Sequence, residues 1–209
     1  MPLLGLGVYK TDSPGEMRGA VAALEAGYRS FDTAQRYGNK APPGEVLQSC
    51  GAPREDLSPD GKPDLCSTRY DRVLSSFEES LSRLCADRLD LFFIHRPDQQ
   101  RGRLLDARRA MERLYEEGRA RGVCNCTVRR LEWLLEECRV PPAVNQVERH
   151  PLLNETALYA WCSARRTALR SRAPRMWGKP DPPPRARLAH AAVRRRRSPC
   201  AGICSAALR

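Results

Sequence analysis

Two residues that can exchange protons lie five positions apart near the start of the chain, in the segment GYRSFDTAQRYGNK (residues 27–40). Asp32 ends a short apolar stretch with the pattern of a strand, and Tyr37 follows on the next loop. Loops beyond the ends of strands carry functional groups on a rigid scaffold, and a carboxylate with a phenol suits acid–base chemistry. A helix-capping aspartate and a buried tyrosine explain the same segment, so both interpretations stay open on this evidence.

Polar side chains also end the later apolar stretches. His95 directly follows LDLFFI, the clearest strand pattern in the chain, and Asn125 and Asn145–Gln146 end the next two. The carboxyl ends of strands in a closed β/α barrel meet at one rim, so these side chains would converge there. A histidine after an apolar strand is also compatible with a core histidine whose hydrogen bonds are satisfied.

The elements that would position these residues alternate between strand and helix. Buried apolar strands joined by amphipathic helices predict an α/β fold with a parallel sheet and right-handed crossovers. Residues 58–64 occupy the place of the third strand, but their two prolines and glycine disfavour a central strand. The apolar pattern predicts strands at 3–9, 28–33, 89–95, 120–124 and 142–146, and helices at 13–26, 43–50, 72–85, 105–117, 127–138 and 154–165.

The basic character of the chain is concentrated at its carboxyl end. The formal net charge is +11, yet residues 165–209 hold 13 of the 36 Lys and Arg and a single acid, which leaves residues 1–164 at −1. That segment is rich in arginine and proline and shows no sustained period, so we expect a disordered tail and divide the chain into 1–164 and 165–209. A GC-rich coding sequence that is translated out of frame also gives a segment of this composition, so a frame error is an alternative origin.

Cysteine and hydropathy patterns favour a cytoplasmic protein. Nine cysteines are scattered without a secretory signal, and three histidines lie far apart, so neither a disulfide framework nor a zinc site is indicated. The longest strongly apolar run is too short to cross a bilayer. We therefore expect no metal and no membrane partner.

Five segments together resemble the signature blocks of the aldo-keto reductases, which are NADPH-dependent TIM-barrel oxidoreductases. They are GLGVYK, GYRSFDTAQRYGNK, DRLDLFFIHRP, EEGRARGVCN and PPAVNQVERHP, within residues 3–163. The resemblance implies reduction of aldehyde or ketone carbonyls to alcohols by hydride transfer from NADPH, with a small-molecule carbonyl substrate as the partner. It also implies an incomplete (β/α)8 TIM barrel of about six β/α units.

The resemblance assigns a catalytic tetrad of Tyr37, Asp32, Lys62 and His95. Lys62 fits the family spacing, because it follows Asp32 by 30 residues and precedes His95 by 33. A tyrosine with an ordinary pKa of about 10 is a slow proton donor at neutral pH, and an adjacent ammonium favours its ionised form. Tyr37 would donate the proton, and Lys62 would lower the pKa of its hydroxyl. Asp32 would hold Lys62 in place, and His95 would orient the substrate carbonyl. Lys62 could instead be a solvated turn lysine, with Arg69 as the nearby substitute cation.

The resemblance also implies cofactor-binding residues. Asn125 and Gln146 match the amides that hold the nicotinamide carboxamide, and Cys124 stands where a serine is usual. Together with Asp32 they form the expected cofactor site. Arg96 and Cys126 replace aromatic residues that are common in the substrate pocket of the family.

Some expected features of the family are missing from the sequence. Seventh and eighth strands, an aromatic residue on the seventh that stacks on the nicotinamide, and basic residues for the 2′-phosphate are not recognisable after Arg165. Six strands would leave two open edges. Whether the chain is an enzyme is therefore open, and a truncated or frameshifted, inactive reductase is an alternative. A second alternative, a nucleic-acid or acidic-surface binder, has only the charge of the tail in its favour.

Overall fold

The structure, a computed structural model, describes residues 2–9, 14–37, 41–63, 69–95, 97, 100–120, 123–124, 126–174 and 204–207. The strands are β1 (Leu4–Gly7), β2 (Ser30–Asp32), β3 (Ser58–Gly61), β4 (Leu91–Phe92), β5 (Val123–Cys124), β6 (Val144–Glu148), β7 (Ala168–Arg172) and β8 (Cys204–Ala207). The helices are α1 (Pro14–Glu25), α2 (Ala41–Ser49), α3 (Tyr70–Leu84), α4 (Arg101–Glu116), α5 (Val128–Glu137) and α6 (Thr156–Ala164), with short 3-10 helices η1 (Gln35–Tyr37) and η2 (Arg54–Asp56).

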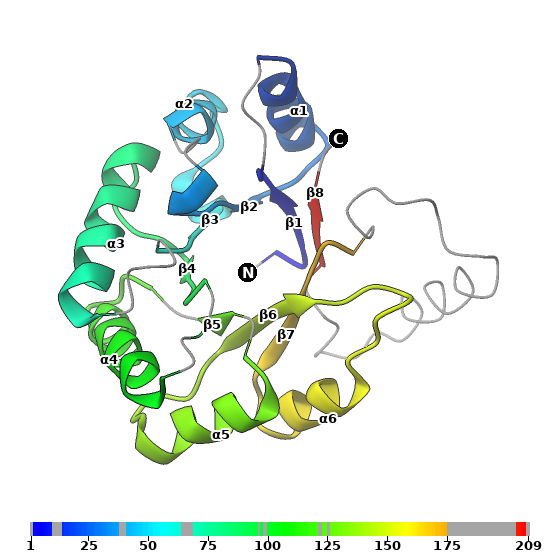
Figure 1. The fold of residues 1–209 in the computed structure, drawn as a ribbon. Coiled ribbons are helices and arrows are strands. Elements are labelled where there is room, and N and C mark those ends of the chain that lie inside the picture. The colour runs from blue at the N-terminus through cyan, green and yellow to red at the C-terminus, as the bar shows by residue number, and fades with distance from the viewer. Residues whose placement is uncertain are drawn as a thin grey trace.

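All the strand pairings that join these eight strands are parallel, in the order β4-β3-β2-β1-β8-β7-β6-β5. Figure 1 shows the strands gathered at the centre with the helices on their outer side, and β8 beside β1. Strand and helix alternate from β1 to α6, as predicted except at the third strand. The carboxyl ends of the strands therefore face one side, where the loops that follow them meet.

The third strand corrects the sequence prediction. Residues 58–61 form β3, which is fully buried and pairs with β2 on one side and β4 on the other, although it contains Pro59. Pro59 has no N–H to donate, but its carbonyl accepts from the Asp90 N–H at 3.1 Å. Directly before β3, the Arg54 guanidinium donates to the Leu57 carbonyl at 2.8 Å and to the Arg88 carbonyl at 2.7 Å. The strand keeps its pairing on both sides although Pro59 donates no hydrogen bond.

The carboxyl-terminal part corrects a second prediction. β7 lies inside the segment 165–209, for which no regular structure was expected, and it pairs with β6 over five residues. β8 lies in the same segment and pairs with β1. The described residues form six β/α units, from β1–α1 to β6–α6, as the sequence predicts, and β7 and β8 add two strands beyond the predicted boundary at 164/165. The rest of the segment for which disorder is predicted, residues 175–203 and 208–209, lies outside the described residues.

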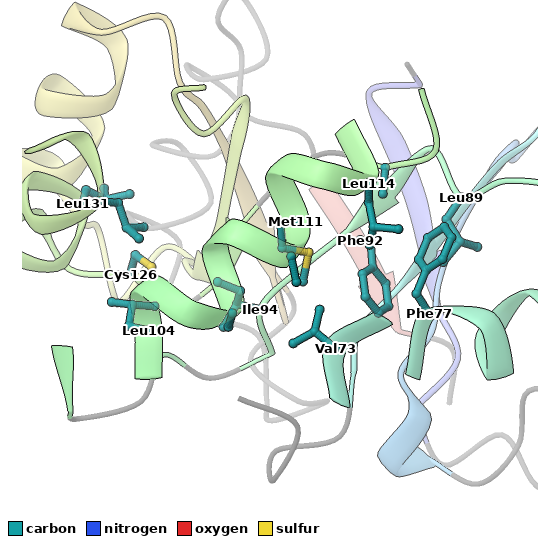
Figure 2. Close-up of a cluster of buried hydrophobic side chains, with 14 of the residues drawn as sticks. Val73, Phe77, Leu89, Phe92, Ile94, Leu104, Met111, Leu114, Cys126 and Leu131 are labelled. Carbon is teal, nitrogen blue, oxygen red and sulfur yellow. The ribbon is translucent and has the colours of Figure 1, made fainter. Parts of the chain in front are cut away.

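The largest hydrophobic cluster lies between the sheet and the helices, and Figure 2 shows part of it. Phe77 of α3 packs edge-on against Phe92 of β4, with ring centroids 5.1 Å apart. Phe92 and Ile94 belong to this outer cluster, whereas Leu91 and Phe93 belong to a separate inner one with Val144. Because successive strand residues face opposite sides, the alternation separates the barrel interior from the helical layer.

None of the helices in the described part of the chain is long and apolar enough to cross a membrane. Over the same residues, no group of three or more His, Cys, Asp or Glu side chains is arranged to hold a metal ion.

Candidate active site

A buried ion pair joins the ends of β2 and β3. Lys62 Nζ contacts Asp32 Oδ1, and both residues are almost fully buried, with 2% and 6% of their surface exposed. Gln146 of β6 donates its Nε2 to the second carboxylate oxygen of Asp32 at 2.9 Å. The interpretation of Lys62 as a solvated turn lysine is therefore wrong. Three segments that lie far apart in the sequence meet at one carboxylate.

Backbone hydrogen bonds fix Lys62 where β3 ends. The Phe93 N–H donates to the Gly61 carbonyl at 2.9 Å, and the Gln35 N–H donates to the Lys62 carbonyl at 2.9 Å. The second bond ties the residue after β3 to η1, the short helix that carries Tyr37. The position of the lysine is thus coupled to that of the phenol through the backbone as well as through side chains.

Tyr37 and His95 lie beside this ion pair. The Lys62 Nζ is 5.9 Å from the centroid of the Tyr37 ring. The rings of Tyr37 and His95 have centroids 6.0 Å apart and planes inclined at 87°. Both residues are only partly buried. The structure therefore brings the four residues of the expected tetrad together, with the ion pair inside and the phenol and imidazole toward the solvent side.

The electrostatics of this group differ from one residue to the next. Burial raises the pKa of Asp32, but the positive charges of Lys62 and Arg170 outweigh that effect and hold the pKa below its ordinary value. Burial, together with the charge of Lys62, lowers the pKa of His95 to about 4. At neutral pH Asp32 is therefore ionised, and His95 is a neutral imidazole that can donate one hydrogen bond.

A second buried ion pair, which the sequence pattern does not predict, lies next to the first. Arg170 of β7 contacts Asp60 of β3, and neither has any exposed surface. Burial raises the pKa of Asp60 to about 6. The signal available in the sequence was an aspartate and an arginine, but both stand in segments whose pattern does not predict strands.

The expected cofactor residues divide into three cases. Gln146 is fully buried at the site, bonded to Asp32 as described. Cys124 ends β5, where its backbone pairs with Gln146. Asn125 lies outside the described residues. β7 carries the sequence ALRSR and so holds no aromatic side chain, while Arg172 at its end contacts Glu148 at 3.2 Å.

Two further predictions concerned the wall of the substrate pocket. Arg96 lies outside the described residues. Cys126 is 1% exposed and belongs to the outer hydrophobic cluster. Its N–H and carbonyl bond to the Asn145 amide at 3.2 and 2.9 Å. Cys126 therefore packs under the helices, and Asn145 fixes the loop after β5.

The comparisons with known proteins agree with this geometry. The sequence profile of the aldo/keto reductase family matches residues 8–169, which is most of the chain. The chain belongs to the aldo/keto reductase family. It is 39% identical over 186 residues to an uncharacterised oxidoreductase, YtbE, of Bacillus subtilis, covering 86% of this chain and 66% of YtbE. It is 40% identical over 182 residues to the glyoxal reductase of the same organism, covering 86% and 65% of the two chains. The chain thus spans less than two thirds of the length of either relative.

Solved aldo-keto reductases share the fold. One, from a deep-sea metagenome library of the Medee basin, superposes with a TM-score of 0.86 at 30% identity, over 100% of this chain and 81% of that one. Another, from Bombyx mori and solved in complex with NADP, gives 0.84 at 24% identity, over 100% and 80%. The parallel eight-stranded sheet is therefore that of a (β/α)8 barrel.

Proposed function

We propose that the chain reduces aldehyde or ketone carbonyls to alcohols with NADPH, using Tyr37 as the proton donor. The observation that carries this proposal is the buried Asp32–Lys62 pair directly beside Tyr37 and His95. Family membership and the likeness to a glyoxal reductase support carbonyl chemistry in general terms. The substrate is thus a small carbonyl compound, and dicarbonyls such as glyoxal are the first to test.

Each residue has a role that follows from its surroundings. Hydride addition to a carbonyl carbon leaves an alkoxide, which takes a proton from the Tyr37 hydroxyl. The ammonium of Lys62 stabilises the phenolate that remains, and Asp32 keeps Lys62 charged and in place. His95, which is neutral at pH 7, donates a hydrogen bond to the carbonyl oxygen and stabilises the charge that develops there.

The residues present fit the nicotinamide end of the cofactor. When bound, NADPH supplies the hydride. The rim that holds Tyr37 and His95 also carries the Gln146 amide and the end of β5, so Gln146, Cys124 and Asn125 are the residues that would hold the carboxamide. The fit is poorer at β7, where Arg172 ends a strand without an aromatic side chain. A planar guanidinium can stack on an aromatic ring, so Arg172 is the residue of β7 to test for contact with the nicotinamide.

The experiment combines cofactor binding with turnover. We expect NADPH to quench the intrinsic fluorescence of the chain and to be consumed with glyoxal or a simple aldehyde. Tyr37→Phe should lower kcat/KM by about 10²- to 10⁴-fold because the general acid is lost. Tyr115→Phe is the matched control, since Tyr115 lies exposed on α4, and it should match the unaltered protein. Equal turnover by Tyr37→Phe would rule out Tyr37 as the donor.

An inactive barrel is the second candidate, favoured by the absence of an aromatic side chain from β7. A chain that folds cooperatively, yet neither quenches with NADPH nor consumes it, would support this candidate against the first.

A further inference from the structure

Two levels of charged and polar side chains fill the barrel interior beneath the candidate site. Ser30 and Asp32 on β2 are two positions apart, as are Asp60 on β3 and Lys62 directly after it, so the members of each pair face the same side of the strand. The upper level contains the Asp32–Lys62 pair, and the lower one contains Ser30 and Asp60 with Arg170. Side chains that fill TIM-barrel interiors are usually bulky and branched, so a charged lower level needs an explanation.

The lower level is closely fitted around Arg170. The guanidinium contacts Asp60 through Nη1 and donates through Nη2 to Ser30 Oγ at 3.1 Å, and Ser30 Oγ donates to Asp60 Oδ2 at 3.2 Å. A Cβ atom on Gly5 would lie 2.7 Å from Nη2 and 2.9 Å from Ser30 Oγ, so only glycine leaves room on β1. Arg170 therefore links β7 to β2 and β3 across the interior.

The two levels are in contact with each other. Gln146, which bonds to Asp32, is the register partner of Arg170 in the β6–β7 ladder. The Phe93 ring lies 5.6 Å from Lys62 Nζ and 5.8 Å from Arg170 Cζ, so one aromatic ring packs near both cations. The charge of Arg170 also helps to keep the pKa of Asp32 low against the effect of burial.

We propose that Arg170 is a positioning residue: through Asp60 and Ser30 it fixes β2 and β3 beneath the Asp32–Lys62 pair, and so holds Lys62 beside Tyr37. The catalytic meaning of this inference rests on the proposed function. The positioning itself can be measured without turnover, because His95 reports on Lys62. The pKa of His95 is lowered first by burial and then by Lys62, with Asp32, Arg172 and Arg36 as the other charged groups that act on it.

The test is an NMR titration of the His95 imidazole in Arg170→Met and in Asp60→Asn/Arg170→Met. At the pH where His95 titrates, Asp60 is largely protonated because its pKa is about 6, so both variants lose the same positive charge there, and the double variant also removes the buried carboxyl group that Arg170 contacts. Arg170 is not among the charged groups named above that act on the His95 pKa, so a shift of the titration reports the position of Lys62. In both variants we expect the proton affinity of His95 to rise about tenfold, a shift of about one pH unit, because Lys62 is no longer held against the site. Arg113→Met removes the exposed Arg113–Glu117 pair and should leave the titration unchanged.

The outcomes separate the two roles of Arg170. A double variant with the wild-type titration would overturn the proposal, because Arg170 would then only neutralise Asp60. If Arg170→Met does not fold, the double variant, in which no buried charge is left unpaired, decides alone. If the unaltered protein turns over NADPH, kcat should fall about tenfold or more in the double variant while the KM for NADPH changes less. If the protein has no turnover, the proposed function fails but the His95 titration still decides the positioning role.

Discussion

Replacing Lys62 with methionine tests the buried ion pair on which the site depends. Methionine keeps most of the volume of lysine but removes its charge, so Asp32 is left buried with Gln146 and Arg170 as its nearest remaining support. Removing one partner of a buried pair costs about 3–5 kcal/mol, because an uncompensated charge stays in the interior. The 2% and 6% exposures of Lys62 and Asp32 place this pair in that class. A domain has only about 5–15 kcal/mol of stability, so the loss should be readily measured.

The loss should depend on pH in a definite direction. In the unaltered protein the pKa of Asp32 is lower in the folded state than in the unfolded state. The ion pair therefore stabilises the fold fully at pH values above the unfolded-state pKa. This stabilisation is lost as the pH falls through the folded-state pKa. Without Lys62, the effect of burial dominates and raises the pKa of Asp32. The variant can then protonate Asp32 in mild acid, so its deficit should be large at about pH 8 and much smaller at about pH 5.

The assay is urea denaturation of both proteins at these two pH values. Comparing variant and parent at the same pH cancels the titration of groups that the substitution does not perturb. Asp32→Asn/Lys62→Met should recover part of the loss at about pH 8, since it removes both charges. A deficit below about 1 kcal/mol, or one that is the same at both pH values, would refute the reasoning, because either result means that Asp32 is not buried as a charge.

Two further substitutions probe the lower level of the barrel interior. The pKa of Asp60 is raised to about 6, so the folded state binds more protons than the unfolded state between about pH 4 and 6. The free energy of unfolding should therefore fall by about 3 kcal/mol as the pH rises through that window. Asp60→Asn should abolish this pH dependence in urea denaturation. Gly5→Ala should lower the free energy of unfolding by about 1–3 kcal/mol, because its Cβ would lie 2.7 Å from Arg170 Nη2. Gly102→Ala is the control, because its Cβ would meet open space, and it should be neutral or stabilising. Thermal melts of both variants measure the difference.

Local periodicity was enough to find the helices and most of the strands. α3 and α5 carry leucine and phenylalanine at helical spacing, and the structure buries Phe77, Leu81, Leu131 and Leu134 of those stripes. This spacing is contained within about a dozen consecutive residues, so it predicts a helix without knowledge of the rest of the fold.

Two of the three strands that the sequence did not predict, β3 and β7, depend on partners that are far away in the sequence. β3 contains Pro59, and its surroundings are completed by Arg54 and by strands on both sides. β7 contains Arg170, whose buried charge is acceptable only because Asp60 lies opposite, 110 residues earlier. No window of sequence contains both members of such a pair, so local rules scored each strand as irregular.

In the candidate site, too, some residues could be predicted from local sequence and others depend on partners far away in the chain. Asp32, Tyr37 and His95 were located by their places at strand ends, and Lys62 by its spacing within the resemblance, since its own segment lacks an apolar pattern. What the sequence could not supply is the layer beneath them, formed by Ser30, Asp60 and Arg170.

The most direct test of the central claim follows the hydride itself. NADPH carrying deuterium at the transferable position of its nicotinamide is incubated with the chain and glyoxal, and the alcohol is analysed by mass spectrometry. We expect deuterium on the former carbonyl carbon, formed at a rate that falls about 10²- to 10⁴-fold in Tyr37→Phe. Binding of NADPH without any deuterated alcohol, or deuterium transfer that is equally fast in Tyr37→Phe, would contradict the assignment of this site.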